Sequence, residues 1–104
     1  MGRPEDVVGA LRDRRATIAT AESLTGGALC ASLVSVPGAS AVVRGGIVAY
    51  TAQMKARLLG VDPALIAEAG LVSAEVAEAM ARGARDATDA SLGVATTGVA
   101  GPEP

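Results

Sequence analysis

Apolar residues recur along the chain with two different spacings, and this divides it into short helices and strands. Val7, Val8 and Leu11 lie at helical spacing behind Pro4, which predicts a helix from Pro4 to about Arg15. The pattern beyond it predicts a strand at 17–21, a helix from 25 to about 34, a strand region at 41–50 with a bulge or turn at 45–46, helices at 52–59, 62–70 and 74 to about 87, and a strand at 92–97.

Residues at the ends of these segments support the assignment. Thr51 is a typical helix N-cap and Gly60 a typical C-terminal residue, and Ser73 is expected to cap the longest helix. Glu78 and Arg82 stand four residues apart on the outer face of that helix. Because strands alternate with helices, the sequence predicts an α/β fold with a mostly parallel sheet and helices on its faces.

The amino-acid composition supports this fold class and argues against nucleic-acid binding. The chain has 104 residues, enough for one domain, and half of them are apolar although Tyr50 is the only aromatic residue. Small residues must therefore fill the core, which favours close packing of helices on a sheet. Nine basic residues stand against eleven acidic ones, so there is neither a basic patch nor an aromatic platform for nucleic acid.

Cysteine usage and hydropathy indicate where the protein works. Cys30 is the single cysteine, and its apolar neighbours predict that it packs in the core of a protein kept in a reducing compartment. The charged N-terminus has no apolar signal region, and no apolar stretch approaches membrane-spanning length. We therefore expect a soluble, cytoplasmic protein that has no membrane partner.

The absence of histidine narrows the possible chemistry most. It excludes Ser-His-Asp and Cys-His catalysis within the chain and removes the commonest metal ligand. No cluster of other metal-ligating residues is visible, so we expect neither a metal nor a cofactor. Acid–base chemistry is left to Lys, Glu, Asp, Tyr or water.

Candidate functional residues gather in three loops, 21–27, 50–55 and 96–102, each at the carboxyl end of a predicted strand. Such loops meet at one edge of a parallel sheet, which would bring Ser23, Tyr50 and Lys55 together. Ser23 precedes a helix that opens with Gly26 and Gly27, whose backbone amides are suited to a phosphate or an oxyanion. Alternatively, Ser23 or Thr25 is only an N-cap.

Lys55 is the only lysine, and the other eight basic residues are arginines, which cannot act as bases at neutral pH. A lysine in the first turn of a helix, with a depressed pKa, can activate Ser23. The alternative is an ordinary surface lysine. Tyr50 would stack on a substrate ring or donate a hydrogen bond, or else fill the core. Glu22 would orient Lys55 or make a purely structural hydrogen-bonded pair.

Six sequence blocks that follow one another in order are AESLTGG (21–27), VPGAS (36–40), GGIVAY (45–50), KARLLGV (55–61), GLVS (70–73) and TGVAGP (97–102). In order and spacing they resemble the CinA C-terminal domain family, the nicotinamide-nucleotide amidohydrolases. The similarity extends from about Val7 onward. Leu24 stands where many relatives have cysteine, and Thr51-Ala52 where many have Ser-Asn.

The resemblance implies a three-layer α/β/α fold and hydrolysis of nicotinamide mononucleotide to nicotinic acid mononucleotide and ammonia. It implies that Ser23 is the nucleophile, Lys55 its partner and Tyr50 a further catalytic residue. The residues expected to contact the mononucleotide substrate are Glu22, Thr25, Gly26, Gly27, Thr97, Gly98 and Gly101. The glycine loops at 25–27 and 97–101 would divide oxyanion and phosphate binding between them.

The resemblance also bears on the extent of the domain. Relatives continue past the Gly-Pro block at 101–102, so we expect residues 1–104 to form a single domain of this type that lacks its last strand and helix segments. An exposed sheet edge would favour a homo-oligomer, a dimer or higher. The alternatives to an enzyme are a non-catalytic nucleotide-binding or regulatory module and a plain assembly domain.

Overall fold

The computed structural model describes residues 2–98, which form a three-stranded parallel sheet with helices on both faces. The elements in chain order are α1 (Pro4–Asp13), β1 (Ile18–Glu22), α2 (Ala28–Val34), the 3₁₀ turn η1 (Ala39–Ala41), β2 (Val43–Val48), α3 (Ala52–Leu59), α4 (Pro63–Ala69), α5 (Ala74–Thr88) and β3 (Leu92–Thr96). The predicted α/β class is confirmed.

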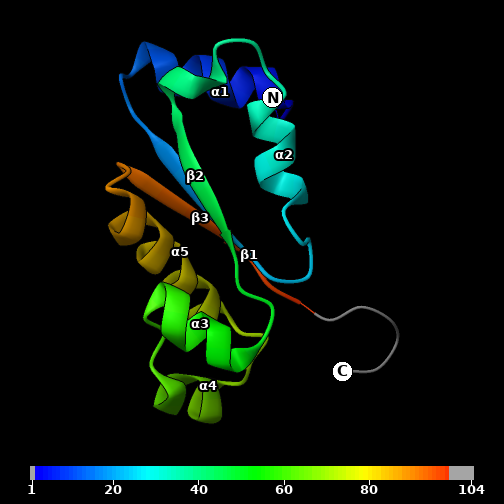
Figure 1. The fold of residues 1–104 in the computed structure, drawn as a ribbon, viewed down its shortest axis with the longest axis vertical. Helices are drawn as coiled ribbons and strands as arrows, with labels where there is room; N and C mark the ends of the chain where they lie inside the picture. Colours follow the sequence, from blue (N-terminus) through cyan, green and yellow to red (C-terminus); the bar gives the residue numbers. More distant parts are fainter. Residues whose placement is uncertain (1, 99–104) are drawn as a thin grey trace.

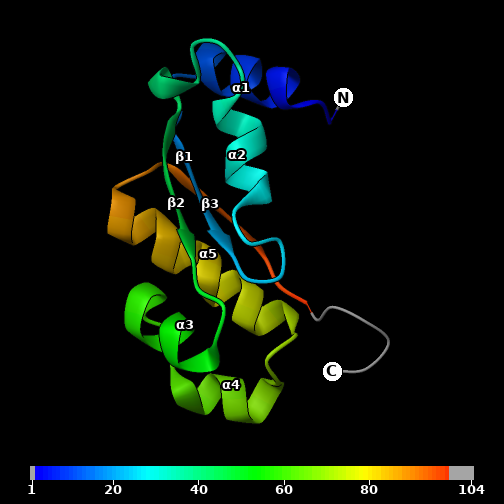
Figure 2. The same cartoon turned by 45° about the vertical axis from the view of Figure 1, so that its right-hand side comes forward.

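The strand order is β2-β1-β3, and the central strand β1 runs parallel to both neighbours. Figures 1 and 2 show α1 and α2 beside one face of the sheet and α3, α4 and α5 beside the other. Side chains of β1 alternate accordingly: Ile18 packs with the apolar cluster of α1 and α2, whereas Ala19 and Ala21 pack with that of α5. The three-layer α/β/α arrangement that the resemblance implied is therefore present.

Glycine and alanine allow the helices to approach the backbone of their neighbours, as the composition predicted. A Cβ atom added to Gly83 of α5 would lie 2.0 Å from the carbonyl oxygen of Leu59, at the end of α3. A Cβ atom added to Gly93 of β3 would lie 1.9 Å from the carbonyl oxygen of Ala81. Both sites leave no room for a side chain, so α5 is clamped between α3 and β3.

Most predicted segment ends are confirmed, because the residues that define them act locally. The side chains of Thr51 and Ser73 accept hydrogen bonds from the amides of Met54 and Val76, and Gly60 ends α3 in a left-handed conformation. Each of these caps involves residues within one helical turn.

The second strand differs from the prediction. Its pairing with β1 skips Arg44, so the bulge lies there and not at Gly45-Gly46. Gly46 faces β1 so closely that an added Cβ atom would lie 2.5 Å from the Thr20 hydroxyl oxygen. Packing thus holds Gly46 in register with β1, and Arg44 is the residue that bulges out of the pairing. The Arg44 side chain donates to the carbonyl oxygen of Thr88 at 2.9 Å.

Candidate active site

The loops that follow the three strands meet at one edge of the sheet, as the topology predicted. Lys55 Nζ, behind β2, donates to Ser23 Oγ, behind β1, at 3.0 Å. The hydroxyl groups of Thr25 and Thr96 lie 2.7 Å apart and connect the serine loop to the end of β3. The structure therefore brings together residues that are 32 and 71 positions apart in the sequence.

Ser23 and Lys55 form a buried pair. The Lys55 side chain is 0% exposed and Ser23 is 4% exposed, so the surface-lysine interpretation is wrong. Lys55 Nζ has a second acceptor, the main-chain oxygen of Tyr50, at 3.4 Å. Both acceptors are neutral, and no carboxylate among residues 2–98 forms an ion pair with Lys55.

This environment favours the neutral amine. Burial lowers the pKa of Lys55 because the ammonium form loses its hydration without gaining an anionic partner. Lys55 is also the fourth residue of α3, where the positive end of the helix dipole opposes a cation. A neutral amine at hydrogen-bond distance from a serine hydroxyl is the geometry required of a general base.

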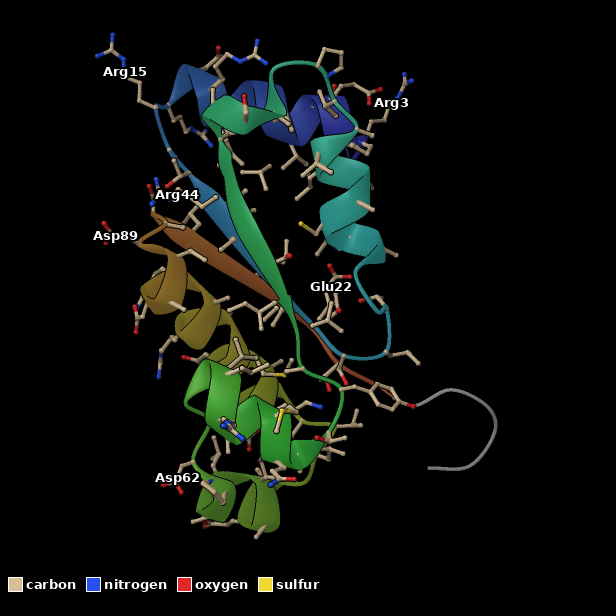
Figure 3. All side chains as sticks on the ribbon, viewed as in Figure 1. Arg3, Arg15, Glu22, Arg44, Asp62 and Asp89 are labelled. Carbon is tan, nitrogen blue, oxygen red and sulfur yellow. The ribbon has the colours of Figure 1, made fainter. Side chains whose placement is uncertain are left out.

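Glu22, which precedes Ser23, faces α2. Figure 3 shows its side chain between the end of β1 and the start of α2, whereas the labelled Arg15 and Asp62 lie at the periphery. The carboxylate is 1% exposed, and each of its four hydrogen-bond donors belongs to the segment that follows. These donors are Thr25 Oγ1 (2.6 Å), Gly27 N (3.2 Å) and Leu29 N (2.9 Å) to Oε1, and Cys30 N (2.9 Å) to Oε2.

These bonds correct the expected start of the second helix. The helix begins at Ala28, not near Thr25, and its N-cap residue is Gly27, which makes no side-chain cap. Neither Ser23 nor Thr25 caps it, so that alternative is wrong. Gly26 and Gly27 have φ angles of 60° and 108°, and this left-handed path carries the chain around the Glu22 carboxylate.

Glu22 is held as an anion. Burial alone would raise the pKa of its carboxyl group, but hydrogen bonds from the Thr25 hydroxyl and from the amides of Cys30, Leu29 and Gly27 outweigh this and lower it. Glu22 thus makes the structural hydrogen bonds that this interpretation expects. None of the contacts within residues 2–98 connects Glu22 to Lys55, and its contact with substrate stays a prediction.

Tyr50 and Leu24 provide apolar surface beside the pair. The Tyr50 side chain is 71% exposed, so it does not fill the core, and its stacking or hydrogen bonding to a substrate stays a prediction. Leu24, the residue after Ser23, is 42% exposed. It lies against Gly98 of the third loop, where an added Cβ atom would be 3.1 Å from Leu24 Cδ2.

The third loop is only partly described. Thr97 Oγ1 donates to the carbonyl oxygen of Leu71 at 3.5 Å, and Gly101 lies outside the described residues. Thr96, whose hydroxyl contacts that of Thr25, was not among the predicted site residues. Its position could have indicated it, because Thr96 pairs with Glu22 in the sheet register and so stands at the same carboxyl edge.

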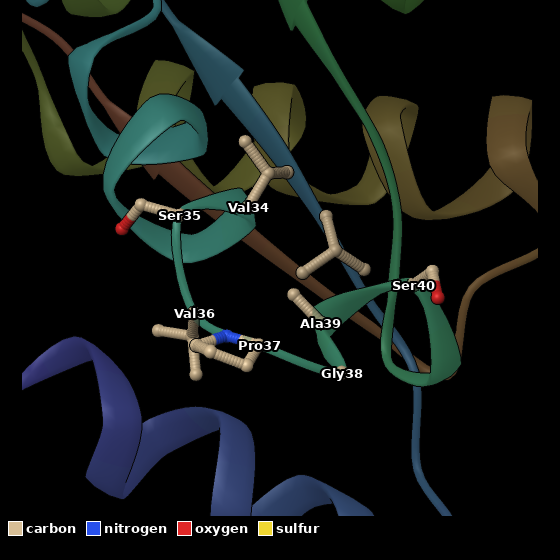
Figure 4. Close-up of a pocket in the computed structure, with 8 residues that line it drawn as sticks. Val34, Ser35, Val36, Pro37, Gly38, Ala39 and Ser40 are labelled. Carbon is tan, nitrogen blue, oxygen red and sulfur yellow. The ribbon is translucent and has the colours of Figure 1, made fainter.

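A hollow at the other end of the sheet offers no competing site. A hollow of about 480 Å³ lies between the end of α2, η1 and the first residue of β2, at the opposite edge of the sheet (Figure 4). Its lining, residues 34–40 and Val43, carries no ionisable side chain.

Residues 2–98 contain no group of three potential metal-ligating side chains placed to hold one ion. None of the helices in this part of the chain has the length and apolar character needed to span a membrane.

Known proteins that resemble this chain in sequence belong to one family. The family model of the CinA C-terminal domain matches residues 3–104. CinA-like proteins of Frankia casuarinae and Mycobacterium avium are 56% identical over 98 residues and 55% identical over 100 residues, which is 94% and 96% of this chain. The chain spans 23% of the length of either relative.

Solved structures show the same fold. The competence/damage inducible protein CihA from Agrobacterium tumefaciens superposes with a TM-score of 0.91 at 37% identity, covering 97% of this chain and 61% of its own. The CinA superfamily protein ECK1530/EC0983 from Escherichia coli superposes with a TM-score of 0.93 at 33% identity, covering 96% and 58%.

Proposed function

The chain belongs to the CinA C-terminal domain family, and from this premise we propose that it hydrolyses the carboxamide of nicotinamide mononucleotide to nicotinic acid mononucleotide and ammonia. One observation carries the proposal: a buried amine, Lys55, donates to a buried serine hydroxyl at 3.0 Å with no anionic partner among residues 2–98. The names of the relatives specify no reaction, so the choice of substrate rests on the six sequence blocks.

The proposed reaction has two steps. In the first, neutral Lys55 accepts the proton of Ser23 Oγ while that oxygen attacks the carboxamide carbon. The C–N bond then breaks, and Lys55 gives the proton to the departing nitrogen. Ammonia is released, and the acyl group remains bound to Ser23 as an ester. In the second step, Lys55 accepts a proton from water while the water oxygen attacks the ester carbon. The ester C–O bond then breaks, Lys55 returns the proton to Ser23 Oγ, and the carboxylic acid leaves.

The hydrogen bonds of the serine loop limit which groups can hold the oxyanion. The amide of Gly26 donates to the Ser23 carbonyl oxygen at 3.1 Å, and that of Gly27 donates to Glu22. The amides of Leu24 and Thr25 donate to no acceptor within residues 2–98. We assign oxyanion binding in this loop to those two groups, in place of the Gly26 and Gly27 amides.

Ammonia release from nicotinamide mononucleotide tests the proposal. Ser23→Ala and Lys55→Ala should each lower kcat by at least about 10³-fold, because each removes one half of the dyad. Arg57→Ala is the matched control, since this exposed residue lies on the same helix as Lys55. It should leave turnover unchanged.

Two results would contradict the proposal. Turnover that persists in Ser23→Ala would exclude this serine as the nucleophile. A folded wild-type chain that releases no ammonia would refute the activity for residues 1–104. Calorimetric titration with nicotinamide mononucleotide would then distinguish a binding module, which takes up the ligand, from an assembly domain, which does not.

A further inference from the structure

Three hydrogen-bonded side chains lie in and beside the loop that carries the nucleophile. Thr96 Oγ1 at the end of β3 lies 2.7 Å from Thr25 Oγ1, which donates to Glu22 Oε1 at 2.6 Å. Glu22 is adjacent to Ser23 in the sequence and is itself 1% exposed. The series joins the ends of β1 and β3 to the loop that carries Ser23.

The charge of Glu22 sets the direction of these bonds. An ionised carboxylate only accepts hydrogen bonds, and a threonine hydroxyl has one proton to donate. Thr25 gives its proton to Glu22, so Thr96 must be the donor in the bond between the two hydroxyl groups. The series therefore runs from Thr96 through Thr25 to Glu22, with the carboxylate as its fixed end.

The same carboxylate fixes the far end of the serine loop. It accepts from the amides of Gly27, Leu29 and Cys30, so the start of α2 cannot move relative to β1 without breaking several bonds to a charged group. Ser23 thus lies in a loop that is attached at one side to Glu22 and at the other to Lys55.

We infer that Glu22, acting with Thr25 and Thr96, is a positioning residue that holds the Ser23 hydroxyl at the distance from Lys55 that proton transfer requires. Glu22 touches neither Lys55 nor Ser23 Oγ in the described contacts, so its effect passes through the loop backbone. The inference rests on the proposed function, and it adds a role for residues that the dyad mechanism does not use.

Replacement of Thr25 by valine and by serine tests the inference. Valine has the shape of threonine without the hydroxyl, whereas serine keeps the hydroxyl. Thr25→Val and Glu22→Gln should lower kcat for nicotinamide mononucleotide by about 10-fold to 100-fold, because a displacement near 1 Å costs on the order of 10²-fold. KM should change by less than about threefold. Thr25→Ser should recover most of the kcat that Thr25→Val loses.

Two further variants separate positioning from general damage. Thr96→Val removes only the outermost donor and leaves every bond of Glu22 in place, so it keeps the test open if Glu22→Gln fails to fold. Thr88→Val is the control for a threonine-to-valine change: Thr88 Oγ1 donates to the Ala84 carbonyl oxygen within α5, away from the serine loop. It should leave kcat unchanged.

A second readout does not depend on the substrate. The rate at which a fluorophosphonate labels Ser23, followed by mass spectrometry, reports the reactivity of the hydroxyl itself. Labelling should be fastest in wild type, intermediate in Thr25→Ser and slowest in Thr25→Val and Glu22→Gln. If wild type labels in this order but releases no ammonia, the proposed substrate is wrong and the positioning role stands.

Other outcomes would overturn the inference. Folded Thr25→Val, Thr96→Val and Glu22→Gln variants that label as fast as wild type would show that the series does not position Ser23. A raised KM with an unchanged kcat would assign these residues to substrate binding instead. Wild-type Ser23 that resists labelling would also refute the inference, because there would be no activated hydroxyl to position.

Discussion

The starts of α2 and α3 both follow the carboxyl end of a strand, and both bury an ionisable side chain, yet they treat charge in opposite ways. At α2 the N-cap residue, Gly27, contributes no side chain, and Glu22 accepts the hydrogen bonds of the first amides. At α3 the helix has its own N-cap, Thr51, and Lys55 lies within its first turn.

The difference shows how one lowered pKa can serve structure and another can serve chemistry. Burial disfavours the charged form of each group, but four hydrogen bonds compensate the Glu22 carboxylate, and its pKa falls. Lys55 has only neutral acceptors, so burial lowers its pKa without compensation. A lowered pKa keeps Glu22 an anion at neutral pH, whereas it favours the neutral amine that Lys55 needs to act as a base.

The largest effect on stability should come from removing the compensated group. Glu22→Ala leaves three partly buried amides and the Thr25 hydroxyl without their acceptor, which should lower the free energy of unfolding by about 3 kcal/mol or more. Lys55→Met keeps an unbranched side chain one atom shorter and removes a buried amine that has no anionic partner among residues 2–98, so it should lose no stability and gain up to about 2 kcal/mol. Urea unfolding at neutral pH measures both.

The comparison would be wrong if the two variants were destabilised equally. A large loss in Lys55→Met would mean that the amine supports the fold as Glu22 does. Because the same substitution should abolish ammonia release, greater stability with lost turnover would mark Lys55 as a residue kept for chemistry at the expense of stability.

Both groups should make stability rise with pH, because both pKa values are lowered in the folded chain, but they should do so in different pH windows. The pKa of Lys55 is lowered, so the unfolded chain binds more protons between that pKa and the ordinary value of 10.5, and stability should rise with pH in this window. The pKa of Glu22 is lowered from 4.5, so its contribution is complete above 4.5 and is lost as pH falls below it.

Unfolding midpoints between about pH 3 and 10 check both windows, and each difference of one between folded and unfolded pKa corresponds to about 1.4 kcal/mol. Lys55→Met should lack the rise at alkaline pH, and Glu22→Gln should lack its share of the loss at acidic pH. A Lys55→Met profile that parallels wild type up to the alkaline limit would show that Lys55 titrates normally.

The contrast also explains what the sequence could and could not predict. The role of Lys55 as a base could be predicted because it is the single lysine, follows a strand end and lies just inside a helix with a local N-cap. Each of these signals lies within a few positions in the chain. The pairing of Ser23 with Lys55 needed only the rule that parallel strands bring their carboxyl ends to one edge.

The role of Glu22 could not be predicted from the sequence in the same way. Ser23 and Thr25 are the usual kinds of cap and stand nearer to the helix, but two left-handed glycines turn the chain so that a strand residue reaches the amides instead. The contact with Thr96 and the bulge at Arg44 likewise depend on sheet register, which is set by packing between strands far apart in the sequence.

The smallest effect should come from the cap that α3 supplies for itself. Thr51→Ala removes one acceptor of the Met54 amide in an exposed position, so it should cost about 1 kcal/mol of unfolding free energy, well below the cost of Glu22→Ala. Ser73→Ala, which removes the equivalent bond to the Val76 amide of α5, is the matched control and should cost about the same. If Thr51→Ala cost as much as Glu22→Ala, the start of α3 would depend on its cap as strongly as the start of α2 depends on a buried carboxylate. If Thr51→Ala and Ser73→Ala cost the same and Glu22→Ala costs more, the larger contribution of Glu22 comes from the several donors that its carboxylate binds at once.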